Sequence, residues 1–155
     1  MTTREMPAPT YVAKNYNGVQ INQSPTIVAR AGEFMADCRN RIMVLGEDGS
    51  AFIARNVEQP ALGSAVVEAG YNDATGTTAG MVEVGEEIDI QIKDIGIALA
   101  GEEIFAGMEV CADTDGRAIF AAGDCYVLGF ALESANENEY FPVQIAKYYK
   151  PASGK

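Results

Sequence analysis

Short apolar runs, separated by turn residues about every ten positions, dominate the chain from Thr26 onward. In residues 87–93 polar residues alternate with Ile88, Ile90 and Ile92, which predicts a strand with one buried and one solvated face. Residues 125–132, CYVLGFAL, are apolar on both faces and predict a strand that lies centrally in a sheet or at a subunit contact. Such short, regularly spaced strands are typical of an all-β domain.

Two Asp-Gly steps, at positions 48–49 and 115–116, each separate a pair of apolar runs. Asp-Gly favours hairpins because these residues accept a positive φ, so the sequence predicts two β-hairpins. A further strand is predicted over residues 140–149, where Phe141, Val143 and Ile145 share one face. Because Pro142 has no N–H to donate, this strand is restricted to an edge or a strand start. We therefore expect an edge strand that is open to pairing with another chain.

A weak internal repeat links the two hairpins. The tripeptide Ala-Gly-Glu at 31–33 precedes the first Asp-Gly step and Ala54, and the same tripeptide at 100–102 precedes the second step and Ala121. The three matches lie at offsets of 69, 67 and 67 residues. The repeat predicts two related structural units, and the alternative is a chance match between two hairpins.

The domain organisation follows from length and composition. A chain of 155 residues, 48% apolar and 21% charged, is long enough to bury a real core as one domain. We expect a compact barrel- or sandwich-like domain of short antiparallel strands over residues 23–149. An extended N-terminal arm, residues 1–22, precedes it, because Pro7 and Pro9 favour extended chain there. Residues 150–155 are expected to form a flexible C-terminal tail.

The net charge of the chain limits the kinds of partner that it is expected to bind. Eleven Lys and Arg stand against 22 Asp and Glu, for a net charge of -11. Residues 1–55 carry +1, residues 56–146 carry -15, and the remaining residues carry +3. An acidic surface repels phosphate and anionic lipid, so we expect neither nucleic-acid nor membrane binding. No run approaches the ~20 apolar residues of a membrane span, and residues 1–12 lack the apolar core of a signal peptide, so synthesis in the cytoplasm is expected.

Histidine is absent, which excludes Ser-His-Asp, Cys-His and His-metal chemistry. Cys38, Cys111 and Cys125 are an odd number at wide spacing, so we expect three free, buried thiols. Asp113-x-Asp115-Gly116 resembles half of a calcium loop, but the further ligand positions hold Cys111 and Ala122, which favours a hairpin turn. The sequence therefore predicts no cofactor and no metal.

Paired glutamates occur at 86–87 and 102–103. Two carboxylates can serve as general acid and base when they flank a substrate. Adjacent residues in a strand point to opposite faces, so neither pair meets across a substrate, and solvated turns are the expected setting for both.

Residues 95–145 carry the pattern that points to a family. They resemble the C-terminal half of phage capsid cement (head decoration) proteins. The matching pieces are Gly96-Ile97-Ala98, Ala106-Gly107-Met108-Glu109-Val110, Asp115-Gly116, Gly129-Phe130-Ala131-Leu132-Glu133 and Val143-Gln144-Ile145. The resemblance implies a structural virion protein and not an enzyme. It implies a homotrimer that binds the major capsid protein on the outer surface of an assembled icosahedral head and stabilises it.

Two sets of residues are assigned to contacts on this interpretation. The expected capsid-binding residues combine apolar and basic side chains of the arm with two arginines of the body: Arg4, Tyr11, Val12, Lys14, Tyr16, Arg39 and Arg41. If residues 39–45 form a strand, the two body arginines share a face. The expected oligomer interface lies on the two C-terminal strands: Tyr126, Leu128, Phe130, Phe141 and Val143.

Two alternatives stay open at the level of the sequence. The first is another virion or tail structural β module. The second is a trimeric all-β enzyme of the dUTPase kind, because residues 69–73, AGYND, faintly resemble a motif of that family. The other motifs of the dUTPases have no match in the chain, which weighs against the enzyme.

Overall fold

The computed structural model describes residues 24–66 and 80–152, and within these ranges the chain is all-β and without helix. No helix that could span a membrane is therefore present in the described part. The strands are β1 Thr26–Arg30, β2 Ile42–Leu45, β3 Ala51–Ile53, β4 Gly63–Ala65, β5 Glu87–Gln91, β6 Ile95–Leu99, β7 Glu109–Ala112, β8 Ala118–Phe120, β9 Cys125–Ala131 and β10 Tyr140–Lys150. The predicted N-terminal arm lies outside the described residues.

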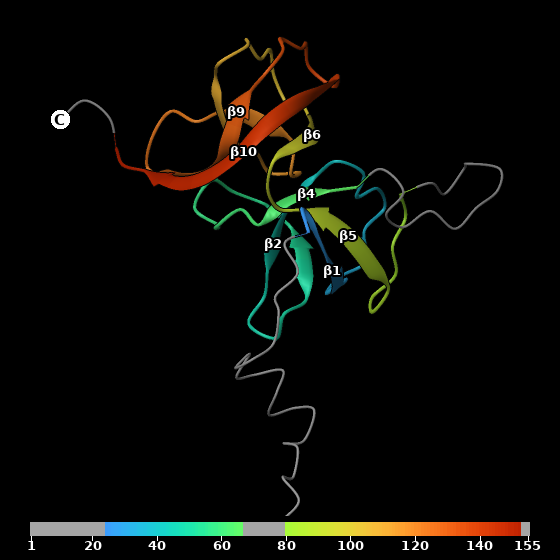
Figure 1. Cartoon of the computed structure of the whole chain (residues 1–155). Helices are drawn as coiled ribbons and strands as arrows, with labels where there is room; N and C mark the ends of the chain where they lie inside the picture. Colours follow the sequence, from blue (N-terminus) through green and yellow to red (C-terminus); the bar gives the residue numbers. More distant parts are fainter. Residues whose placement is uncertain (1–23, 67–79, 153–155) are drawn as a thin grey trace, which may run out of the picture.

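The strands form two antiparallel five-stranded sheets with the same internal order. The first sheet runs β1-β5-β4-β2-β3 and the second runs β6-β10-β9-β7-β8, so each strand of the first has a counterpart five strands later. Figure 1 shows the sheet of β6–β10 above the sheet of β1–β5. We call residues 24–66 and 80–94 the first unit and residues 95–152 the second unit. The sandwich-like, all-β prediction is confirmed.

Hydrogen bonds repeat between the units as closely as the strand order does. The amide of Gly32 donates to the Ala51 carbonyl at 2.8 Å, and the amide of Gly101 donates to the Ala118 carbonyl at 2.8 Å. The glutamate that follows each glycine accepts a backbone N–H of the third strand of its unit: Glu33 from Ile53 at 3.1 Å, and Glu102 from Phe120 at 2.8 Å. The Ala-Gly-Glu repeat therefore marks two related structural units, as predicted.

The predictions that rest on polar–apolar alternation and on the two Asp-Gly steps are confirmed. In β5 the side chains of Ile88 and Ile90 are fully buried while Glu87 and Asp89 are exposed. Both Asp-Gly steps close antiparallel hairpins, β2 with β3 and β7 with β8. The glycines at these turns, Gly49 and Gly116, have φ values of 87° and 75°, which is the left-handed region that glycine adopts without strain.

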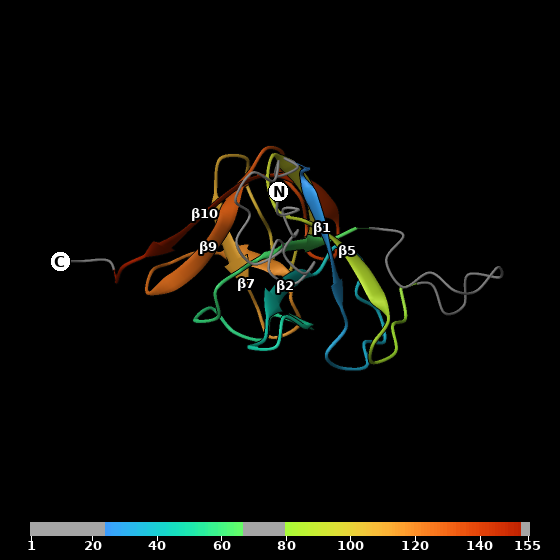
Figure 2. The same ribbon diagram turned by 60° about the horizontal axis from the view of Figure 1, so that its bottom comes forward.

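The expectation of an edge strand around Pro142 is wrong. β10 lies between β6 and β9 and pairs with both, and Figure 2 shows it beside β9. Pro142 is tolerated because its carbonyl accepts the amide of Leu132 at 2.9 Å, one residue past the end of β9. The N–H that proline lacks would point to the same side as this carbonyl, toward a residue beyond the end of β9. The missing donor therefore costs no hydrogen bond between residues of β9 and β10.

The hydrophobic core joins the two units. One cluster of buried side chains contains Phe141, Val143 and Leu128 of the second unit together with Ile42 and Val44 of the first. A second cluster lies within the first unit. Burial of large aliphatic and aromatic side chains contributes about 1.5 to 3 kcal/mol each, so the shared cluster ties the folding of one unit to that of the other.

Candidate functional site

The two body arginines lie close together, though not for the predicted reason. The strand begins at Ile42 and not at residue 39, and Asn40 between the arginines has a φ of 56°, so strand alternation does not place them. A hydrogen bond from the Arg41 guanidinium to the Arg39 carbonyl joins them instead, and Asp37 lies beside both. Arg39 donates to both oxygens of its carboxylate at 2.9 and 2.8 Å, and the charges of Arg39 and Arg41 both act on it.

The electrostatics of this group follow from its geometry. Burial by itself would raise the pKa of the Asp37 carboxyl, but the hydrogen bonds from Arg39 and the two guanidinium charges lower it below its ordinary value. The same side-chain bond raises the pKa of Arg39. Arg41 donates to the Arg39 carbonyl at 3.0 Å and forms no ion pair within the described residues. Arg41 is therefore the cation of this group that is available to a partner.

A pocket of about 380 Å³ lies beside Arg41. Its apolar lining comes from Phe34, Met35 and Ile53, and its charged lining consists of two bases and two acids, Arg41, Arg55, Asp37 and Asp115. Arg55 is paired with Glu33 at 3.1 Å. The pocket thus has an apolar floor with two bases and two acids around it, which suits an apolar side chain that is flanked by polar or charged groups.

The predicted oligomer-interface residues separate into two groups. Leu128, Phe141 and Val143 are at most 1% exposed and belong to the core that joins the units, so their assignment to a subunit contact is corrected. They are covered within one chain because β9 and β10 pack against strands of the first unit. Phe130 is exposed and Tyr126 is half-buried, and for these two the interface stays a prediction. The arm residues Arg4, Tyr11, Val12, Lys14 and Tyr16 lie outside the described residues.

Sequence reasoning missed an apolar face on the second sheet. The register places Ile97, Pro142 and Leu132 in one row across β6, β10 and the end of β9. The next row contains Ile95, Gln144 and Phe130. Alternation along β6, with Ile95 and Ile97 exposed and Gly96 and Ala98 buried, was the signal that could have found this face.

An aromatic pair marks the far half of β10. The rings of Tyr126 and Tyr149 are 5.0 Å apart in an edge-to-face arrangement, and the Tyr149 hydroxyl hydrogen-bonds the Asp124 carboxylate. That bond raises the pKa of Tyr149 to about 12. Lys150, the last residue of β10, binds the Glu109 carboxylate at 2.7 Å. These contacts anchor the part of β10 that extends past β6.

The remaining candidate chemistry is structural in the described residues. Asp113 accepts the amides of Asp115 and Arg117 and the Nε of Arg117, at 2.7 to 3.0 Å, so its carboxylate closes the hairpin turn, as expected. The three cysteines are buried thiols, also as expected. Burial raises the pKa of the Cys38 thiol to about 11, and burial with the nearby Cys125 raises that of Cys111 to about 12. The AGYND segment lies outside the described residues.

Comparison with known proteins finds a likeness in fold and none in sequence. No known protein family matches the chain by sequence, and no curated protein sequence matches it. The fold is similar to the crystal structure of the N base of the head fiber gp8.5 in bacteriophage phi29, with a TM-score of 0.53 and 21% identity. The likeness covers 78% of this chain and 92% of that one. It establishes a shared fold across both units.

Proposed function

We propose that this chain is a structural protein of a phage virion that decorates the outer surface of the assembled head and stabilises it, without an enzymatic role. The observation that carries the proposal is the fold shared with the base of a phage head fiber over most of both chains. The resemblance of residues 95–145 to cement proteins supports the same role independently, because it rests on turn and strand residues of one unit.

The proposal includes how the protein attaches. Arg41, next to the pocket lined by Phe34, is available to an acidic group of the major capsid protein. The N-terminal arm, residues 1–22, is proposed to add a second contact, and a homotrimer would multiply these contacts by avidity. Exposed ion pairs contribute only about 0.2 to 1 kcal/mol each, so several small contacts must act together.

The test is the composition and surface of the particle. Particles of the phage that encodes this chain are purified by density gradient, and the chain is sought in them by mass spectrometry. Cryo-electron microscopy then compares heads made with and without it. We expect additional density on the outer surface and a lower disruption temperature for heads that lack the chain. Absence of the chain from purified particles would refute the virion role, and density inside the head would refute decoration.

A further inference from the structure

The two units of the fold carry different side chains on equivalent faces of their sheets. The register aligns Thr26, Gln91 and Ser64 in a row of the first sheet, and Ile95, Gln144 and Phe130 in the equivalent row of the second. The neighbouring rows pair Val28 with Asp89 in the first sheet and Ile97 with Pro142 in the second. Each position on the second sheet can therefore be compared with its equivalent on the first.

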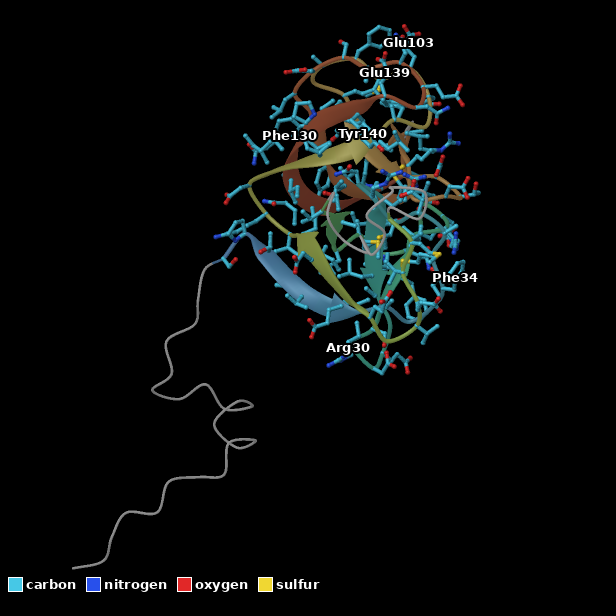
Figure 3. All side chains as sticks on the ribbon, turned by 90° about the vertical axis from the view of Figure 1, so that its right-hand side faces the viewer. Arg30, Phe34, Glu103, Phe130, Glu139 and Tyr140 are labelled. Atoms are coloured by element: carbon cyan, nitrogen blue, oxygen red, sulfur yellow. The ribbon has the colours of Figure 1, made fainter. Side chains whose placement is uncertain are left out.

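The difference is one of polarity. In the first unit Arg30 lies opposite Glu87 and forms an ion pair with it at 3.8 Å. The equivalent positions in the second unit hold Leu99 and Tyr140. The apolar outer face of the second sheet is made up of Ile95, Ile97, Phe130, Leu132 and Tyr140, which are 55, 39, 38, 40 and 52% exposed, together with Pro142. Gln144 is a polar member of this face, between Ile95 and Phe130. Figure 3 labels Phe130 and Tyr140 on the second unit and Arg30 on the first.

If solvent exposure alone decided polarity, exposed positions would be polar and covered positions apolar. The two equivalent positions, Ser64 and Phe130, show the opposite. Ser64 of the first unit is buried because β6 crosses over it, and a Cβ on Gly96 would stand 3.0 Å from the Ser64 hydroxyl. The covered position is thus polar, while its exposed counterpart is Phe130. A contiguous exposed apolar face on one of two repeated units is typical of a surface that binds a protein partner.

The charges around the face indicate the chemistry of that partner. Asp94, Glu133 and Glu139 each adjoin a residue of the face in the chain, and none of them takes part in the ion pairs of the described residues. Two cations near the face are already neutralised, because Arg39, which interacts with Tyr140, is paired with Asp37, and Lys150 is paired with Glu109. Lys93 and Lys147 leave the acids in excess by three to two among the charges near the face that are unpaired within the described residues. Contact with a second copy of this face would place the acids of one copy near those of the other, which repel. A partner with basic residues at its rim would attract these acids.

We propose that the apolar outer face of the second sheet docks on a protein surface that is apolar at its centre and lined by Lys or Arg at its rim. Under the proposed function, on which this inference rests, that surface belongs to the phage head. Phe130 and Tyr140, one on each side of the row of Ile97, Pro142 and Leu132, are the aromatic anchors of the face, because buried aromatic side chains dominate the energy of most interfaces. The ion pair of Arg30 with Glu87, on the equivalent face of the first unit, stays free of this contact.

The test converts the face of the second unit into that of the first. Phe130→Ser and Tyr140→Glu introduce the residues found at Ser64 and Glu87, and Val28→Ser is the matched control on the first unit. Binding to heads made without the chain should fall roughly tenfold or more for the double variant and change less than about twofold for the control. Tyr140→Glu alone, at a half-exposed position, gives a milder second variant, and circular dichroism checks that each variant folds.

Charge reversal at Glu133 tests the basic rim. Glu133→Lys should weaken binding at ~0.05 M salt, and the difference should narrow at ~0.5 M. Stronger binding of Glu133→Lys would overturn the basic partner. Equal binding of parent and double variant would overturn the face while leaving the virion role intact, and a change of oligomeric state in the double variant with unchanged binding would assign the face to a second copy instead. If the parent chain does not bind heads, the proposed function fails and this inference fails with it.

Discussion

Replacing Phe141 with alanine should destabilise both units of the fold at once. Phe141 is 1% exposed and belongs to the cluster that contains buried side chains of the first unit as well as the second. Truncation removes the ring and leaves a cavity, at a typical cost of about 3 to 5 kcal/mol. For a chain of this size each kcal/mol lowers the thermal midpoint by roughly 2 to 4 °C, so a decrease of about 6 to 20 °C is expected.

Tyr140 offers a control in the same strand. Its side chain is 52% exposed and points to the opposite face of β10, so Tyr140→Ala should cost about 1 kcal/mol or less. The assay is urea and thermal unfolding followed by circular dichroism, with hydrogen exchange to report on β2 and β3 separately. A loss below ~1 kcal/mol for Phe141→Ala, or two separate transitions of which only one moves, would refute a core shared by the two units.

Three further outcomes follow from particular contacts. Gly129→Ala should cost about 1 to 3 kcal/mol or more by forcing β9 and β10 apart, because its Cβ would stand 1.9 Å from the Gln144 carbonyl oxygen; unchanged urea unfolding would contradict this close approach. Ultraviolet titration should find one tyrosine with a pKa of about 12 that Tyr149→Phe removes. Since this pKa is raised, the stabilisation is complete below the unfolded value of ~10 and is lost as the pH rises toward 12. Thiol titration should find three reactive groups per denatured chain and almost none in the folded chain at pH ~8; a denatured value near one would reveal a disulfide.

The sequence alone determined the features that depend on neighbouring residues. Alternation in β5 placed Ile88 and Ile90 in the core, and the two Asp-Gly steps located the hairpins. The Ala-Gly-Glu repeat predicted two related units, because the same local hydrogen bonds, from Gly32 and Gly101, recur wherever that tripeptide meets the same hairpin. Period and turn chemistry act over a few residues, so they can be read without knowing the fold.

Only the tertiary structure decided which strand neighbours which and what covers each face. Pro142 indicated an edge strand, yet β10 is central because its missing donor meets the end of β9. Phe130 and Phe141 look alike in sequence, but one is exposed and the other is buried by packing between units. The apolar outer face joins β6, β9 and β10, whose register depends on pairing between distant segments. Burial is a property of the assembled sheets, and a linear pattern does not specify which of two apolar faces will be covered.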